Sequence, residues 1–252
     1  MTTKPRRILH ILPVAVPPAA LEAFVAQLPS QIIDPDVQIE FTAPARGARN
    51  MIDSAYERTV SDAAVLAAGA GAADKGFHAV VVNSMSDSGI SGLRSRLDIP
   101  VVGACQASMA LASCLGNRIG VVTMWPRWHT LYTAAAAAAG LTHRLVTVRD
   151  IGTRPDAEEL LPDRYTVFPK LLDTCRQAVE HDGSDVLILG STTMHPAHTY
   201  LARHLDVPLI NPGVAAHQLA QQLLRAGLTH SRRSYPAPQR PDDDLLAAFA
   251  SG

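Results

Sequence analysis

Two distant stretches of the chain, Val80-Val81-Val82-Asn83-Ser84 and Val186-Leu187-Ile188-Leu189-Gly190-Ser191, share one pattern, a short apolar run that ends at a serine. Each is followed by a loop and a second related run, Leu97-Asp98-Ile99-Pro100-Val101-Val102 and Leu205-Asp206-Val207-Pro208-Leu209-Ile210. From Ser84 to Ser191 is 107 positions and from Pro100 to Pro208 is 108, so the copies differ by a single insertion. The pattern predicts a duplicated structural unit.

Outward from these stretches, short runs rich in Ile, Leu and Val alternate with segments of helical length. This alternation is typical of parallel strands covered by helices on both faces, so we predict an α/β fold. Strands are predicted at 8–12, 37–42, 79–83, 101–104, 119–123, 144–148, 186–189 and 209–210. Helices are predicted at 18–28, 54–75, 89–97, 108–115, 128–139, 165–181, 197–205 and 214–226.

The duplication predicts two similar lobes, one made of residues 1–112 with 218–252 and the other of residues 113–217, with the last long helix packed back on the first lobe. Ligands of open parallel sheets bind outside the carboxyl ends of the strands. Two facing lobes would therefore place Ser84 and Ser191 on opposite sides of one cleft. The alternative is that the two units look alike only because all strand-helix units share a composition.

Composition narrows the class of partner. The chain has 252 residues, of which 47% are apolar and 18% charged, with 22 basic residues against 23 acidic ones. That balance is unlike a disordered chain or a polyanion binder, so we expect no nucleic-acid partner. The longest uncharged stretch, 100–117, is interrupted by Gly103, Gln106 and Gly116, so we expect no membrane span. The N-terminal apolar run is too short and lacks a clean cleavage site for a signal peptide.

The cysteines and the nucleotide and metal motifs narrow the chemistry further. The three cysteines, Cys105, Cys114 and Cys175, lack CxxC spacing and are odd in number, which favours a reducing, cytoplasmic setting. The patterns GxGxxG, GxxxxGK[ST], HExxH and GxSxG do not occur, so neither a nucleotide, nor zinc, nor an esterase-type serine has support. We therefore expect no metal site.

Several motifs, taken in order, resemble the aspartate/glutamate racemase superfamily and within it the hydantoin racemase branch. They are the loop Asn83-Ser84-Met85-Ser86-Asp87-Ser88-Gly89, the run Ile99-Pro100-Val101-Val102-Gly103, Gly120-Val121-Val122-Thr123, the loop Leu189-Gly190-Ser191-Thr192-Thr193-Met194 and the tail 227–235. The resemblance implies two flavodoxin-like lobes related by a pseudo-twofold axis, a small-molecule substrate and no cofactor. We further expect a homo-oligomer, either a dimer or a tetramer.

The chain departs from the family at the two positions that matter most. Members of the family typically carry a cysteine in each loop, and the two thiols act from opposite faces of the substrate. Here the positions hold Ser84 and Ser191. A thiol with a reference pKa near 8.5 can be tuned into the working range, whereas an unassisted serine hydroxyl ionises far outside it. A thiol mechanism cannot be transferred unchanged.

A second departure lies after the first strand. The family often has Asn-Pro-Asn-Thr there, whereas this chain has Leu12-Pro13-Val14-Ala15. The polar side chains that would contact a carboxylate or ring amide are missing. Pro13 and Val14 therefore predict a more apolar ligand, or one held in another orientation.

Three interpretations of the chemistry remain open. In the first, Ser84 and Ser191 serve an isomerase with help from a neighbouring base, for which His195 and Asp87 are the candidates. In the second, hydroxyls and loop amides stabilise an enolate-like charge, as in a decarboxylase or lyase of an activated carboxylate. In the third, the protein is a catalytically silent binding protein on a racemase scaffold. The expected ligand contacts are Pro13, Val14, Asn83, Met85, Ser86, Thr123, Trp125, Gly190, Thr192 and Thr193.

Among these interpretations we favour a cofactor-independent isomerase of the racemase type. Its expected substrate is a small carbonyl compound, such as an amino-acid derivative, a hydantoin-like ring or a small carboxylate. The reaction would run in the cleft between the lobes, through proton transfer or enolate stabilisation.

Overall fold

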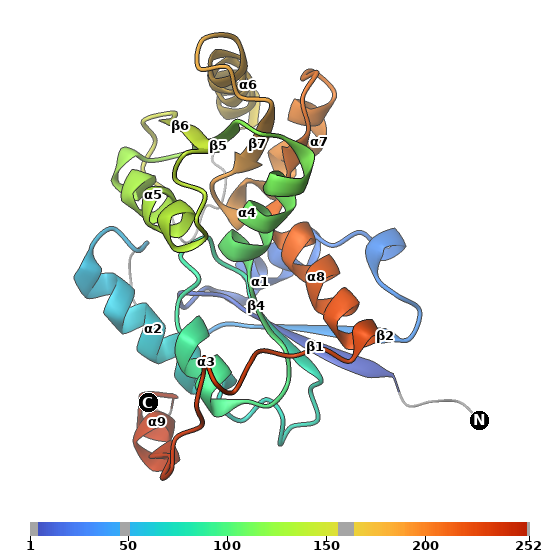
Figure 1. Cartoon of the computed structure of the whole chain (residues 1–252), viewed down its shortest axis with the longest axis vertical. Coiled ribbons are helices and arrows are strands. Elements are labelled where there is room, and N and C mark those ends of the chain that lie inside the picture. Colours follow the sequence, from blue (N-terminus) through green and yellow to red (C-terminus); the bar gives the residue numbers. More distant parts are fainter. Residues whose placement is uncertain (1–4, 46–50, 156–163, 251–252) are drawn as a thin grey trace.

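A computed structural model describes residues 5–45, 51–155 and 164–250 of the chain (Figure 1). It contains two four-stranded parallel sheets with the same strand order, β2-β1-β3-β4 in the first lobe and β6-β5-β7-β8 in the second. The predicted α/β fold of two duplicated lobes is confirmed. The strands are β1 (Arg6–Ile11), β2 (Val37–Thr42), β3 (Ala79–Val82), β4 (Val101–Gly103), β5 (Ile119–Thr123), β6 (Leu145–Asp150), β7 (Val186–Leu189) and β8 (Leu209–Ile210).

Three of the four central strands are buried along their whole length, and β1 is buried from Ile8 onward. Every residue of β3, β5 and β7 is buried, which explains why these strands read as continuous apolar runs rather than as alternating ones. The duplication extends to the register, because Ile8 of β1 pairs with Ala79 at the start of β3, and Ile119 of β5 pairs with Val186 at the start of β7. The carboxyl ends of equivalent strands therefore lie at equivalent positions in the two sheets.

Helices cover both sheets. Those that follow the strands of the first lobe are α1 (Pro18–Val25), α2 (Ala55–Gly69), α3 (Ile90–Arg96) and α4 (Ala104–Leu115). Those that follow the strands of the second lobe are α5 (His129–Ala138), α6 (Arg164–Glu180), α7 (His195–Ala202) and α8 (Pro212–Ala226). A ninth helix, α9 (Asp243–Ala250), packs on α2. None of the helices in the described part of the chain is long and apolar enough to span a membrane.

Two helices join the lobes. The helix α4 follows β4 of the first sheet and contacts β7 and α5 of the second lobe. Conversely, α8 follows β8 of the second sheet and contacts β3 and β4 of the first, and it packs directly on α4 (Figure 1). The crossing of α8 agrees with the expected return of the last long helix to the first lobe. The lobe boundaries at 112/113 and 217/218 stay a prediction.

Some helix boundaries differ from the sequence prediction. The helix predicted at 54–75 ends at Gly69, and the chain continues as turns to Gly76, whose φ of 78° is in the left-handed region that favours glycine. The helix predicted from 108 begins at Ala104, directly after β4. The helix α9 was not predicted, although its first turn holds Asp243 and Asp244, which suit the positive end of a helix dipole.

Candidate active site

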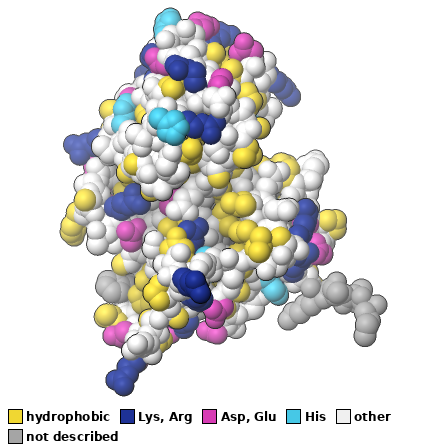
Figure 2. Space-filling view, viewed as in Figure 1, with side chains coloured by type: hydrophobic (Ala, Val, Ile, Leu, Met, Phe, Trp, Pro, Cys, Tyr) yellow, Lys and Arg dark blue, Asp and Glu magenta, His cyan; other side chains and the backbone are white. Residues whose placement is uncertain are grey.

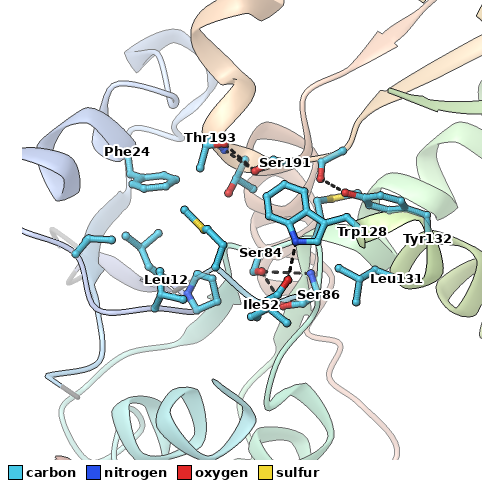
Figure 3. Close-up of a pocket in the computed structure, with 17 residues that line it drawn as sticks. Leu12, Phe24, Ile52, Ser84, Ser86, Trp128, Leu131, Tyr132, Ser191 and Thr193 are labelled. Carbon is cyan, nitrogen blue, oxygen red and sulfur yellow. Dashed lines mark hydrogen bonds between the residues drawn. The ribbon is translucent and has the colours of Figure 1, made fainter. Parts of the chain in front are cut away.

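A small pocket, here called the inner pocket, lies between the lobes beside the loops that follow β1, β3 and β7 (Figure 3). Its volume is about 60 Å³. Both lobes contribute to it, as the predicted cleft requires. It is lined by Leu12, Pro13, Val14, Val16, Phe24, Met51, Ile52, Ser84, Met85, Ser86, Trp128, Leu131, Tyr132, Gly190, Ser191, Thr192 and Thr193.

The two serines occupy matching loops in the two lobes. After β3, the Ser84 Oγ accepts a hydrogen bond from the Ser86 backbone N–H at 3.2 Å and lies 2.8 Å from the Ser86 Oγ. After β7, the Ser191 Oγ accepts from the Thr193 backbone N–H at 3.2 Å and lies 2.8 Å from the Thr193 Oγ1. Because the same three bonding groups recur at the same spacing, the internal duplication reaches the level of individual hydrogen bonds (Figure 3).

This bonding determines what the two hydroxyls can do. A hydroxyl has one proton to donate and two lone pairs that accept. The backbone N–H uses one lone pair of each serine oxygen, and the neighbouring hydroxyl can use the second when it turns to donate. In the first lobe the series of hydrogen-bonded hydroxyls continues from Ser86 to Ser88, whose Oγ atoms are 2.8 Å apart. In such hydrogen-bonded chains each bond polarises the next. Ser84 and Ser191 can thus donate toward the pocket when the neighbouring hydroxyls donate to them, and in that arrangement they are poor proton acceptors.

The rest of the lining is mostly apolar. Leu12, Val14 and Phe24, all buried, come from the end of β1 and from α1, and Phe24 faces the serine loops across the pocket (Figure 3). On the other side, the Trp128 Nε1 donates to the Ile52 carbonyl at 2.6 Å and so ties the second lobe to the first. One end of a ligand bound in this pocket would contact hydroxyl groups, and the rest of it would contact apolar side chains.

Tyr132 adds a phenol that is fully used in bonding. It lies on α5, one turn after Trp128, so both side chains are on one helix face. Its hydroxyl donates to the Gly190 carbonyl and lies 2.9 Å from the Thr123 Oγ1. Burial raises the pKa of Tyr132, so the phenol is neutral at physiological pH. Tyr132 supports the Ser191 loop from behind and does not supply a base.

His195, expected as a proton carrier for Ser191, does not line the inner pocket. The turn Thr192–Met194 carries the chain away from Ser191, and the His195 ring lies 6.4 Å from the ring of Phe24. Burial lowers the pKa of His195 to about 4. Its Nε2 is buried and has no hydrogen-bond partner among the described residues. The structure places this histidine behind the apolar wall, as a neutral group.

Asp87, the second expected proton carrier, also lies outside the inner-pocket lining. One of its carboxylate oxygens accepts from the Cys105 N–H at 3.0 Å and the other from the Gln106 N–H at 2.9 Å, so it caps the start of α4. Burial raises the pKa of Asp87 to about 6. Its φ of 49° is unusual for a residue other than glycine and marks the sharp turn of the loop. The carboxylate fixes the Ser84 loop on α4.

Three of the expected ligand contacts lie close to the inner pocket without lining it: Asn83, Thr123 and Trp125. The Asn83 carbonyl accepts from the Thr192 hydroxyl at 3.2 Å, which joins the two serine loops. Trp125 precedes the turn Pro126–Trp128, is half-buried, and packs edge-on against Trp128 with the ring centroids 6.2 Å apart. The other expected contacts, Pro13, Val14, Met85, Ser86, Gly190, Thr192 and Thr193, do line the inner pocket.

The sequence did not predict several lining residues, among them Phe24, Ile52, Leu131 and Tyr132. The aromatic pair Trp128 and Tyr132, four residues apart, is the signal that could have found the second-lobe wall. All three cysteines are free, and the inner-pocket lining includes none of them. Among the lining residues Tyr132 alone is titratable. Within the described ranges no group of three or more His, Cys, Asp or Glu side chains could hold a metal ion.

Fold and site together define a class of protein: a two-lobed α/β chain with a small-molecule pocket between matching loops at the strand ends. Residues 19–220 match the family described as Asp/Glu/Hydantoin racemase, and the chain belongs to this family.

Individual relatives agree with this assignment. The chain is 28% identical over 208 residues to a hydantoin racemase of Pseudomonas sp. (strain NS671), which covers 82% of each chain. The structure of the chain described here is similar to that of allantoin racemase from Pseudomonas fluorescens, with a TM-score of 0.85 and 26% identity. The match covers 94% of this chain and 98% of the other. Arylmalonate decarboxylase shares the fold, with a TM-score of 0.60, 18% identity and coverage of 88% and 94%.

Proposed function

We propose that this protein is a racemase-type isomerase whose substrate is a small cyclic carbonyl compound with an apolar substituent, and that it acts by stabilising the enolate of that substrate. The observation that carries the proposal is the pair of matched loops, in which a backbone N–H donates to each of the Ser84 and Ser191 oxygens, so that each hydroxyl can direct its proton at a ligand. The reaction requires no cofactor in this scheme.

The chemistry starts at the carbon next to the carbonyl. When its C–H bond breaks, the electron pair moves into the carbonyl group and the negative charge collects on oxygen. Donors already oriented toward that oxygen stabilise the charge, an effect that typically contributes about 3–4 kcal/mol per donor. Return of a proton to the opposite face of the same carbon gives the other enantiomer, so atoms and charge balance over the cycle.

The inner pocket does not supply the proton acceptor. Its one titratable lining residue is Tyr132, whose pKa is raised by burial. In place of the thiols that the family typically uses, Ser84 and Ser191 donate hydrogen bonds, and we propose that water or hydroxide takes the proton. The rate should therefore rise continuously with pH, without a plateau near neutrality.

The lining also supports a choice of substrate. The relatives include proteins named hydantoin racemase and allantoin racemase. Allantoin carries a polar ureido group, which would meet Leu12, Val14 and Phe24 without a hydrogen-bond partner among them. A hydantoin with a benzyl group at carbon 5 is larger than the pocket volume of about 60 Å³, so the walls would have to move apart before its ring carbonyl met the hydroxyls and its phenyl group met the apolar wall.

The test is the rate at which each enantiomer of 5-benzylhydantoin and of allantoin loses optical rotation. We expect 5-benzylhydantoin to racemise faster than allantoin, and Ser84→Ala and Ser191→Ala each to lower the rate at least tenfold. Ser30→Ala, an exposed serine away from the pocket, is the matched control. A wild-type protein that racemises neither compound, yet is stabilised against heat by both, would instead indicate a binding protein.

We also propose that the protein is a cytoplasmic homo-oligomer. Exposed leucines lie on the two joining helices, Leu111 and Leu115 on α4 and Leu219 on α8, and Figure 2 shows apolar side chains gathered over α8 between the lobes. Burying them against a second copy would remove apolar surface from water. Light scattering should give more than one chain per particle for the wild type and a smaller particle for Leu219→Lys. The free cysteines fit a reducing compartment.

A further inference from the structure

A second and larger cavity lies beside the inner pocket. This outer groove, with a volume of about 630 Å³, runs between α4 and α5 and also borders Arg58 of α2 and Asp87. Met85, Ser86 and Leu131 line both cavities. They form the partition between the inner pocket and the outer groove. Figure 1 shows α2 of the first lobe and α5 of the second on the same side of the molecule.

The groove is bordered by a cation, Arg58 of α2. Arg58 is half-buried, and within the described residues its guanidinium group has no hydrogen bond or ion pair. Its charge acts on the carboxylate of Asp87, and so does the charge of Arg94. Both oxygens of Asp87 are already bonded to backbone N–H groups of α4. Arg58 and Arg94 both act to lower the pKa of Asp87, and neither forms an ion pair with it among the described residues.

A second donor borders the same groove. The Gln106 side-chain oxygen accepts from the Arg94 guanidinium at 2.9 Å, which fixes the amide and leaves its nitrogen to donate. Opposite it, the α5 wall consists of alanines, among them Ala134 and Ala138, which leave room for a ligand and offer it no competing acceptor. A guanidinium and an amide nitrogen beside an apolar wall suit a carboxylate, since arginine binds carboxylate oxygens through two parallel bonds.

We propose that the outer groove is a binding site for the carboxylate group of a small organic acid, with Arg58 as its main contact. The inference extends the proposed function, on which it rests, by adding an anion site next to the inner pocket. Compounds that carry both a carboxylate and an apolar group, such as ring-opened N-carbamoyl amino acids, would engage both cavities. Neutral hydantoin rings would use the inner pocket alone.

The experiment measures binding by calorimetry with one probe for each cavity, malonate for the outer groove and 5-benzylhydantoin for the inner pocket. Arg58→Ala should weaken malonate at least tenfold, Arg58→Lys should weaken it less, and Ser191→Phe, which fills the inner pocket, should leave malonate unchanged. For 5-benzylhydantoin we expect the reverse, with loss in Ser191→Phe and no change in Arg58→Ala. Arg127→Ala removes an exposed arginine that lines neither cavity and should change neither affinity.

The outcomes separate the two proposals. Malonate binding that depends on Arg58, together with no binding of 5-benzylhydantoin, would support the outer groove and count against the proposed function. Wild-type protein that binds no malonate, or malonate binding that survives in a folded Arg58→Ala protein, would overturn the anion site. So would malonate binding that Ser191→Phe abolishes. Thermal unfolding of each variant establishes that it is folded.

Discussion

Asp87 gives a quantitative link between the site loop and stability. Its carboxyl is 8% exposed, and burial raises its pKa from 3.8 to about 6. An acid whose pKa is higher in the folded state binds its proton more tightly when folded. Its contribution to the free energy of unfolding is therefore full below pH 3.8 and declines as the pH rises through 6. A difference of roughly two pKa units corresponds to about 3 kcal/mol at 1.36 kcal/mol per unit.

The perturbation is Asp87→Asn, which stays neutral at every pH. Asparagine also tolerates the left-handed backbone that Asp87 adopts. Urea unfolding of both proteins between pH 4 and 7 gives the difference in the free energy of unfolding, wild type minus variant, in which the other titrating groups cancel. We expect this difference to fall by about 2 kcal/mol across the range, because the rest of the total of about 3 kcal/mol is lost below pH 4.

Asp185→Asn is the matched control, because Asp185 also accepts two backbone N–H groups, those of Asn117 and Arg118, but is less buried. Burial acts to raise the pKa of Asp185, yet those hydrogen bonds hold it below its ordinary value. The difference for Asp185 should therefore grow slightly with rising pH, and only at the acid end of the range. If the Asp87 difference stays constant or grows as well, the bonds to α4 outweigh burial and the reasoning is refuted.

Three further substitutions test the packing and chemistry of the site. Gly103→Ala places a Cβ 2.3 Å from the Asp87 Oδ1 and 2.7 Å from the Ile90 Cδ1. The substitution should therefore lower the free energy of unfolding by about 1–3 kcal/mol in urea titrations. An unchanged midpoint of unfolding would contradict this packing. Tyr132→Phe leaves the Gly190 carbonyl without its phenol donor and should cost about 1–3 kcal/mol by the same assay, whereas a neutral effect would mean that water replaces the phenol. The double variant Ser84→Cys with Ser191→Cys supplies thiols with a reference pKa of about 8.5, so the racemisation rate should rise at least tenfold and level off near that pH; a profile like that of the wild type would argue against hydroxyls at the reacting carbon.

The strands of both sheets could be predicted because short apolar runs in the sequence mark where they lie. Strands 37–42, 119–123, 186–189 and 209–210 lie where the apolar runs placed them. Continuous burial on both faces leaves a strong signal in the sequence of a parallel sheet. The two serine loops followed from the same runs, because the carboxyl ends of parallel strands are fixed by the strands themselves.

The walls of the inner pocket were less predictable, because they depend on contacts between distant elements. Phe24 reaches the pocket from α1, and Ile52 reaches it from the segment before α2 to accept a bond from Trp128 of the other lobe. Contacts of this kind between distant segments leave no local pattern in the sequence. His195 follows Ser191 closely in sequence, yet the 3-10 turn Thr192–Met194 lies between them and His195 does not line the pocket.

The central claim is that the hydroxyls of Ser84 and Ser191 stabilise charge on a substrate whose α-proton exchanges with water. The most direct measurement follows the α-proton of 5-benzylhydantoin by proton NMR in D2O. We expect exchange above the buffer rate with wild-type protein, loss of that exchange in both Ser84→Ala and Ser191→Ala, and its retention in His195→Asn. Exchange that persists in both serine variants, or that disappears in His195→Asn alone, would contradict the claim.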